Sequence, residues 1–391
     1  MLDGLFSPWP CYCEEEKQSV LAVLDSNRVN YWTGNETRTF ENEFAAFCEA
    51  EFAIAVANGS VALDLIFKTL ALPEGAEVIV TSRTFFASVS AIVLAGLTPV
   101  FADVDRDSQN ITADTVRPLI SEKTAAVLCV HLAGWPCDMP SLMDLANEHK
   151  LIIIEDCAQA HGARVAGQPV GSFGHLSAWS FCQDKIMTTG GEGGMVTTNS
   201  KDLWRQAWEF KDHGKSYQAV YERAHPQGFR WLHESFGTNW RMTEMQAAIG
   251  RVQLTKMPHW QQRREQNARQ ILDAARQLSG LRVPSLPAQV THAWYKCYVF
   301  VEPDQLQPGW HRDRIMQSIN DRGVPCFSGS CSEVYLEKAF DQTSFRPANR
   351  LKNARQLGET SLMFLVHPSL KAEEIKKTTE TLEQVMREAS R

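Results

Sequence analysis

Three polar residues in the middle of the chain, Asp156, Gln159 and Lys185, have types and spacing that suit chemistry on a carbonyl group. Asp156 ends the apolar run LIIIED, and Gln159 follows three residues later in EDCAQAHGA. Lys185 comes 29 residues after Asp156 and follows a second apolar run, LSAWSFC. A lysine amine forms a Schiff base with a carbonyl, and a carboxylate holds a ring nitrogen in its protonated form. Each of two residues, taken alone, has an alternative interpretation: Asp156 as a helix N-cap, and Lys185 as a surface charge.

Short apolar runs alternate with helix-like segments through the first half of the chain. The runs lie at residues 76–81, 99–104, 125–131, 151–156, 176–182 and 194–199. This alternation predicts a largely parallel, buried sheet with helices on both faces. The carboxyl ends of parallel strands share one edge of a sheet, so Asp156 and Lys185 should face one crevice. An acid and a lysine in one crevice are what pyridoxal 5′-phosphate (PLP) requires of a protein.

The pattern changes after about residue 241. Long helical stretches at residues 242–257 and 260–278 precede a strand at 294–302, and helices are expected at 312–323 and 371–389. We therefore expect an α/β protein with a large cofactor-binding domain at residues 1–250 and a smaller α+β domain at 251–391. Residues 211–239 contain no clear element and predict a long surface or interface excursion.

Composition excludes several protein classes. The 391 residues are 44% hydrophobic and 22% charged, which is typical of a globular protein. The net charge of −7 argues against a nucleic-acid binder that works by general electrostatics. The N-terminus has no long apolar stretch, and the uncharged runs at 84–102 and 165–183 are interrupted by turn residues, so we expect a cytoplasmic protein without a signal peptide or membrane span.

Cysteine spacing predicts thiols rather than a metal site. The ten cysteines lack a disulfide framework, and we expect reduced, mostly buried thiols. No metal site is predicted, because two groups of residues have spacings that match no established zinc-binding pattern. These groups are Cys11 with Cys13, and Cys129 with His131 and Cys137. The glycine-rich segment TGGEGGMV precedes a strand, and no P-loop or GxSxG elbow is present, so the common phosphate-binding and hydrolase motifs are absent.

The chain resembles the DegT/StrS-type sugar aminotransferases, whose fold is the aspartate-aminotransferase-like PLP fold (fold type I). The resemblance covers nearly the whole chain and rests on several segments in family order. These are ANGSVALDLIF, VTSRTFFASVSAI, PVFADVD, EDCAQAHGA, SFCQDK, GGEGGMVTTN and NWRMTEMQAAIG. It implies a large domain with a mostly parallel central sheet and a smaller C-terminal domain.

The resemblance also implies roles for the three chemical residues. Lys185 is similar to the lysine that binds the cofactor covalently and then moves a proton as a general base. Asp156 is similar to the partner of the pyridine nitrogen, and Gln159 to the glutamine beside the ring hydroxyl. Phe85 matches the aromatic that stacks on the cofactor ring, although Phe86 adjoins it and either ring could be core.

Four further residues match positions around the cofactor phosphate. Gly59 and Ser60 match a turn whose amides bind that phosphate, and Ser180 adds a hydroxyl. A helix start is a suitable place for such an anion. Asn239 matches an asparagine that reaches the phosphate from the neighbouring subunit, which implies a homodimer with shared active sites.

Substrate residues are less well defined by the sequence. Trp32 and Thr33, with Trp9, either line the substrate entrance or pack in a core or interface. Arg241 either binds an anionic substrate group or pairs with a nearby acid. Arg83 stands where many relatives have an aromatic, and it adds a cation to the site if it points inward. His161 is expected to be a structural hydrogen-bonding residue rather than an acid or base.

The resemblance implies a PLP-dependent aminotransferase that moves an amino group from L-glutamate to a keto- or aldehydo-sugar by a ping-pong mechanism, in amino-sugar or surface-polysaccharide biosynthesis. A nucleotide-linked sugar is the first expectation. An acidic sugar such as an oxidised 3-deoxy-octulosonate is the alternative, motivated by Arg83 and by the unusual segment 326–340. A PLP-dependent sugar dehydratase would have a histidine in place of Lys185, and a non-enzymatic sensor would lack the lysine or the aspartate.

Overall fold

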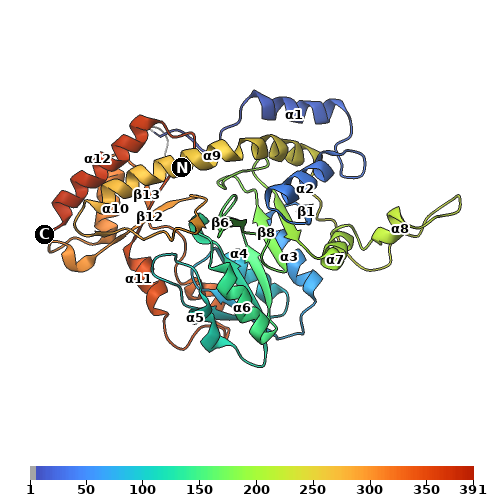
Figure 1. Cartoon of the computed structure of the whole chain (residues 1–391), viewed down its shortest axis with the longest axis horizontal. Coiled ribbons are helices and arrows are strands. Elements are labelled where there is room, and N and C mark those ends of the chain that lie inside the picture. Colours follow the sequence, from blue (N-terminus) through green and yellow to red (C-terminus); the bar gives the residue numbers. More distant parts are fainter. Residues whose placement is uncertain (1–5) are drawn as a thin grey trace.

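A computed structural model describes residues 6–391, and its central feature is a seven-stranded sheet in the order β1-β9-β8-β5-β4-β2-β3 (Figure 1). Strands β8, β5, β4, β2 and β3 run parallel, and β9 is antiparallel to both of its neighbours. The predicted largely parallel sheet is therefore confirmed. The strands are β1 (Phe52–Val56), β2 (Glu77–Thr81), β3 (Thr98–Ala102), β4 (Thr124–Val130), β5 (Ile152–Asp156), β8 (Leu176–Ser180) and β9 (Gly194–Thr198).

Both faces of the sheet are buried, which explains why its strands are continuous apolar runs. Successive side chains of β4 alternate between two cores: Leu128 belongs to one, and Val127 and Cys129 to the other. Helices α3 (Gly59–Leu70), α4 (Phe86–Leu94) and α7 (Lys201–Lys211) contribute to the first core. Helices α2 (Glu36–Phe47), α5 (Ala113–Val116) and α6 (Met139–His149) cover the opposite face.

A single helix, α9 (Glu244–Arg276), replaces the two helical stretches expected from the sequence. Pro258 lies inside it and removes one backbone donor, yet the helix continues because Met257 and Trp260 are buried in the core beside it. The helix packs on α1 (Glu14–Asp25) and α2 at one end and on α12 (Ala372–Ala389) at the other. The predicted domain boundary at residue 250 falls inside α9 and stays a prediction.

The C-terminal part contains a second sheet of four strands in the order β10-β12-β14-β13. A three-stranded sheet, β11-β6-β7, joins this part to the chain after β5. The strands are β10 (Leu281–Arg282), β12 (Cys297–Val301), β13 (Cys326–Phe327), β14 (Ser361–Phe364), β11 (Val290–Thr291), β6 (Arg164–Val165) and β7 (Gln168–Pro169). Helices α10 (Arg312–Asp321) and α11 (Lys352–Thr360) also belong to this part, with 3₁₀ turns at Pro303–Gln305, Val334–Leu336 and Lys338–Phe340. Two further 3₁₀ turns, Arg117–Leu119 and Leu132–Gly134, flank β4 in the central sheet.

Residues 211–239 form an arm that extends away from the body and carries the short helix α8 (Tyr217–Tyr221) (Figure 1). Its exposed aromatic side chains are Tyr221, Phe229, Trp231 and Phe236, and Phe236 is 99% exposed. Large exposed aromatic rings are typical of a surface that contacts another macromolecule. Among the helices of residues 6–391, none is long and apolar enough to cross a membrane.

Candidate active site

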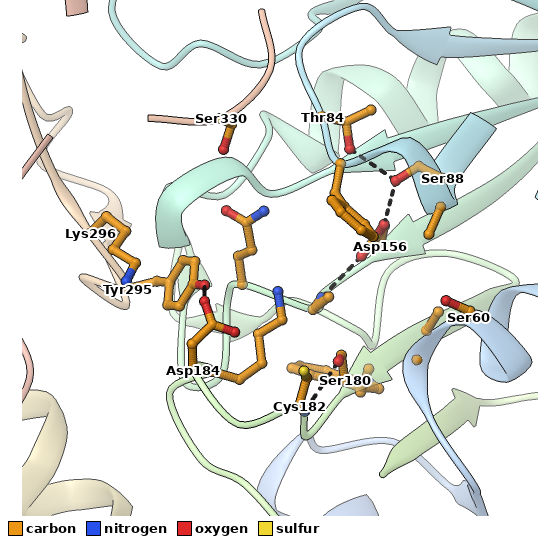
Figure 2. Close-up of a pocket in the computed structure, with 18 of the residues that line it drawn as sticks. Ser60, Thr84, Ser88, Asp156, Ser180, Cys182, Asp184, Tyr295, Lys296 and Ser330 are labelled. Atoms are coloured by element: carbon orange, nitrogen blue, oxygen red, sulfur yellow. Dashed lines mark hydrogen bonds between the residues drawn. The ribbon is translucent and has the colours of Figure 1, made fainter. Parts of the chain in front are cut away.

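A cavity of about 740 Å³ lies between the central sheet and the C-terminal part. The ends of β5 and β8 and the start of α3 form one side, and residues near β12 and β14 form the other. Figure 2 shows Ser60 and Ser180 on one side of it and Tyr295 and Lys296 on the other. The cavity therefore lies at the carboxyl ends of parallel strands, where open α/β sheets bind their ligands.

Asp156 lines this cavity, and two hydrogen bonds hold its carboxylate. It is the last residue of β5, and Ser88 Oγ donates to its Oδ2 at 2.8 Å (Figure 2). The amide of Ala158 donates to its Oδ1 at 3.1 Å. Thr84 Oγ1 lies 2.9 Å from Ser88 Oγ and completes a short polar chain. Both carboxylate oxygens are thus fixed in direction while the residue still lines the cavity.

Lys185 faces the same cavity from the loop after β8. Its backbone is fixed at both ends, because its amide donates to Cys182 O at 3.1 Å and Trp9 Nε1 donates to its carbonyl at 2.7 Å. Its Nζ lies 5.2 Å from the centroid of the Tyr295 ring. Within residues 6–391, no carboxylate oxygen lies within 4.0 Å of this ammonium group. The side chain is therefore available for a ligand, unlike a solvated surface charge.

Gly59, Ser60 and Ser180 form a tight corner of the cavity. Helix α3 begins at Gly59, and Asn58 Oδ1 caps it by accepting a hydrogen bond from Val61 N at 2.9 Å. The amides of the first helical residues have no partner within the helix, which suits an anion. A Cβ on Gly59 would lie 2.6 Å from Ser180 Cβ, so the corner accepts only glycine without a shift. These features fit the phosphate of PLP.

Gln159 and Phe85 line the same cavity. Gln159 Oε1 accepts a hydrogen bond from the amide of Ala133 at 2.8 Å, which orients the side chain. Phe85 directly precedes α4 and is 69% exposed, whereas Phe86 packs against Phe340 in the core with ring centroids 6.0 Å apart. The structure thus brings Phe85, and not Phe86, into the cavity.

Arg83 does not enter the cavity, which corrects the expectation of an added cation in the site. It is fully buried, and Nε donates to Gln109 Oε1 at 2.9 Å. Nη1 and Nη2 donate to Ser332 Oγ and Ser361 Oγ at 2.5 and 3.0 Å. The guanidinium joins the large domain to the C-terminal part. Burial lowers its pKa, but an arginine remains charged.

Trp32, Arg241 and Asn239 are also outside the cavity within one chain. The buried Asp212 carboxylate accepts hydrogen bonds from Arg241 Nη1 at 2.7 Å and from Trp32 Nε1 at 3.3 Å. Arg241 therefore pairs with an acid, which was one of its two predicted roles. Asn239 is exposed at the base of the arm and bridges to Asp212 through the backbone. Thr33 is exposed and donates to Asn30 O at 3.2 Å.

The cavity residues that the sequence interpretation did not find include Ser88, Asp184, Tyr295 and Lys296. Tyr295 OH donates a hydrogen bond to Asp184 Oδ2 (Figure 2). Burial alone would raise the pKa of Asp184, but the Lys185 charge and this hydrogen bond hold it below its usual value. Burial lowers the pKa of Lys296 to about 8. Of these residues, only Asp184 could have been found from the sequence, because it directly precedes Lys185.

His161 differs from its expected role as a hydrogen-bonding residue. It is fully buried, and neither ring nitrogen has a hydrogen-bond partner among residues 6–391. Its ring packs between Trp179 and Phe181, at centroid distances of 5.1 and 5.6 Å. Burial, with the nearby charges of Lys185 and Arg264, lowers its pKa to about 3. The imidazole is therefore neutral at ordinary pH.

His131, Glu155 and Cys157 lie close enough to be considered as metal ligands. The Nε2 atom of His131 faces Glu155 Oε2 at 3.1 Å, and its Nδ1 accepts from Cys137 N at 3.0 Å. Both histidine nitrogens are thus used inside the protein. Of the ten cysteines, all are free thiols and six are buried, as the sequence predicted.

Comparisons with known proteins agree with this geometry. The model of the DegT/DnrJ/EryC1/StrS aminotransferase family matches residues 10–383. The chain is 42% identical over 245 residues to GDP-perosamine synthase of Escherichia coli O157:H7, a match that covers 63% of this chain and 64% of that protein. It is 33% identical to the dTDP-3-amino-3,4,6-trideoxy-alpha-D-glucose transaminase of Streptomyces venezuelae, over 91% of this chain and 88% of that one. The crystal structure of an aminotransferase from Psychrobacter cryohalolentis is 58% identical, with a TM-score of 0.96 over 98% of this chain and 99% of that one.

Proposed function

The chain belongs to the DegT/DnrJ/EryC1/StrS aminotransferase family, and on that basis we propose that it transfers an amino group from L-glutamate to a nucleotide-linked keto-sugar by a ping-pong mechanism. It is a transaminase, and its family and fold imply PLP as the cofactor. The single observation that carries the proposal is the convergence of Asp156, Lys185 and the Gly59 corner on one cavity.

The residues of this cavity have two roles: some would take part in the chemistry, and others would position the cofactor. Lys185 would hold the cofactor covalently, and its Nζ, once free, would move a proton at the reacting carbon of the substrate. Ser88 and the Ala158 amide hold both oxygens of Asp156 in place. This carboxylate would set a negative charge against the ring nitrogen of the cofactor and favour its protonated form. When bound, PLP supplies an electron-withdrawing ring that makes loss of that proton easier.

The remaining residues position the cofactor. Gly59, Ser60 and Ser180 would bind its phosphate at the start of α3. Phe85 would stack on its ring, and Gln159 would lie beside the ring hydroxyl. These roles come from the resemblance, and the placement of all five residues around one cavity supports them.

We also propose that the enzyme is a homodimer with shared active sites. Asn239 is outside the cavity of its own chain, and it lies at the base of the arm that carries exposed aromatic residues. Phe229 and Trp231 are 77% and 79% exposed in the single chain. A partner subunit would cover these rings and would receive Asn239 at its cofactor phosphate.

A nucleotide-linked sugar is favoured over an acidic sugar as the amino acceptor. Two of the relatives named above have a GDP- or dTDP-linked sugar in their names. The acidic alternative depended on an inward-pointing Arg83, and that guanidinium is bound to three side chains away from the cavity. The presence of Lys185 also disfavours the dehydratase alternative.

An absorbance spectrum of the purified protein with PLP tests the proposal. We expect a visible band from the bound cofactor that is lost on addition of L-glutamate and returns with a keto-sugar acceptor. Lys185→Ala should abolish the band, while Lys352→Ala, at an exposed position on α11, should keep it. A band that L-glutamate leaves unchanged would exclude this donor. The absence of any band in the wild-type protein would refute the cofactor assignment.

A further inference from the structure

We infer that Lys296 is the residue that binds a carboxylate of the amino donor, an inference that rests on the function proposed above. The donor is a dicarboxylic amino acid, so its amino group must reach the cofactor carbon to which Lys185 would be attached, while its carboxylates stay ionised. A carboxylate that leaves water needs a cation or several donors in the protein. The cationic residues of the cavity are therefore the first place to look.

Within the described chain, the cations that line the cavity are Lys185 and Lys296. The first is needed for the chemistry and cannot also hold the donor. The arginines nearby are unavailable: Arg83 and Arg241 are engaged outside the cavity. Arg264 is buried on α9 and does not line the cavity, and its guanidinium carbon lies 5.0 Å from the centroid of the Trp9 ring. This leaves Lys296 as the cation that a donor can meet.

The surroundings of Lys296 hold it in place for such a contact. Its amide donates to Ala133 O at 3.3 Å, and the amide of the same Ala133 binds Gln159 Oε1. Ala133 has a φ of 58°, a left-handed conformation that is uncommon for alanine. Ala133 therefore fixes the backbone of Lys296 and the side chain of Gln159 relative to each other.

The ammonium group of Lys296 is not neutralised by the protein. Its Nζ lies 4.7 Å from the centroid of the Tyr295 ring, and Lys185 Nζ lies 5.2 Å from the same centroid. The charge of Asp184 raises the pKa of Lys296, but one Asp184 oxygen is bound to Tyr295. No ion pair within 4.0 Å joins Asp184 to Lys296 in residues 6–391. Figure 2 shows Lys296 and Tyr295 side by side on the wall opposite Ser180. An unpaired cation there attracts an anionic ligand.

The charges around Lys296 also make its affinity for an anion depend on pH. Burial and the positive charges of Arg264 and Lys185 lower its pKa, Asp184 raises it, and the result is about 8. The neighbouring His367 is neutral, because burial lowers its pKa to about 3. Lysine is cationic below its pKa, so binding of a carboxylate should weaken as the pH rises above about 8.

Glutarate is the probe, because it has the two carboxylates of the donor but no amine and cannot react. Its dissociation constant for the PLP-loaded protein is measured by calorimetry for four proteins: wild type, Lys296→Gln, Lys296→Arg and the surface control Lys352→Gln. We expect Lys296→Gln to weaken glutarate binding about tenfold to hundredfold, since one charged hydrogen bond is lost. Lys296→Arg should restore binding, and Lys352→Gln should not change it.

A pH series adds a readout that a purely structural role would not produce. From about pH 7 to pH 9, glutarate binding should weaken in the wild type and stay level in Lys296→Arg, because arginine does not lose its proton in this range. The visible PLP band should be equal in all four proteins, which shows that each variant folds and holds the cofactor. Equal glutarate binding by the wild type and Lys296→Gln would overturn the inference.

Binding of a nucleoside diphosphate tests whether Lys296 binds the nucleotide-linked acceptor instead of the amino donor. If Lys296→Gln weakens binding of UDP or GDP but leaves glutarate unchanged, the lysine serves the acceptor and our assignment is wrong. If the wild-type band does not respond to L-glutamate at all, the proposed donor fails, whatever Lys296 does. A wild type that responds and a Lys296→Gln variant that responds with the same half-saturation would refute only the present inference.

Discussion

Replacing the buried carboxylate of Glu155 by an amide should strongly destabilise the fold. Glu155 precedes Asp156 on β5 and is fully buried. Its oxygens accept five hydrogen bonds at 2.7–3.2 Å. The donors are Phe173 N, Gly174 N and Ser177 Oγ at Oε1, and Gly171 N and His131 Nε2 at Oε2.

The cost of Glu155→Gln follows from this geometry. The amide NH₂ must replace one of the two oxygens, and each oxygen position faces at least two donors. The His131 ring cannot adapt, because its Nδ1 accepts from the Cys137 amide and its Nε2 therefore carries the hydrogen. At least two hydrogen bonds to a charged group are lost, at about 1.5–3 kcal/mol each, so we expect a loss of about 3–6 kcal/mol in the free energy of unfolding.

Urea unfolding of the apo protein, followed by circular dichroism, measures this loss. Glu148→Gln is the matched control, because Glu148 is exposed, pairs only with surface groups such as Arg117, and should change stability by no more than about 0.5 kcal/mol. A loss of less than about 1 kcal/mol in Glu155→Gln would refute the reasoning.

The same site predicts a pH dependence. Burial alone would raise the pKa of Glu155, but the hydrogen bonds from His131 and the backbone amides lower it below its ordinary value of 4.5. A carboxyl group with a lowered pKa stabilises the fold above its ordinary pKa and loses that contribution as the pH falls through the folded-state value. The wild type should therefore lose more stability in acid than Glu155→Gln does.

Three further changes test other parts of the structure. Gly59→Ala should weaken PLP retention about tenfold, seen as earlier loss of the visible band on dialysis, because the new Cβ meets Ser180 at 2.6 Å; retention equal to that of the wild type would contradict a closed corner. Arg83→Lys should lower the free energy of unfolding by about 2 kcal/mol without changing glutarate affinity, because a lysine cannot reach three separated oxygens; a large loss of affinity would return Arg83 to the cavity. Trp9→Phe replaces the indole by a smaller ring that has no donor for Lys185 O, and urea unfolding should show a loss of at least about 1 kcal/mol, whereas an unchanged midpoint would make that hydrogen bond unimportant.

Much of the fold was predictable, because it is encoded in local patterns. The apolar runs at β2, β3, β4, β5, β8 and β9 correspond to strands, and short runs between helices leave few arrangements other than a parallel sheet. Strand β1 was not predicted, since FAIAV contains two alanines and stands alone before α3. The sequence analysis predicted two helices on either side of Pro258, but the structure has one continuous helix there. Burial of the neighbouring side chains outweighs the one missing backbone hydrogen bond.

The site was predictable where residues lie at strand ends and not where they depend on distant contacts. Asp156 and Lys185 follow apolar strands, and their meeting follows from the topology of the sheet. The direction of Arg83 depends on Ser332 and Ser361, which are 249 and 278 residues away along the chain. Lys296 joins the cavity through a contact with Ala133, and no spacing in the sequence records that contact.

The segment around residues 7–10 sets a condition on how the enzyme is made. Ser7 Oγ donates to Glu374 Oε2 at 3.0 Å on α12, and Ser369 Oγ donates to Pro8 O at 2.7 Å. Trp9 then reaches from this contact to the carbonyl of Lys185. The partners of Ser7 and Pro8 lie 367 and 361 residues further along the chain, so these contacts form only after those residues have left the ribosome. The support that the N-terminal segment gives to the loop of the reactive lysine is therefore completed late, and a chain that stalls before residue 369 lacks the contacts that anchor this segment.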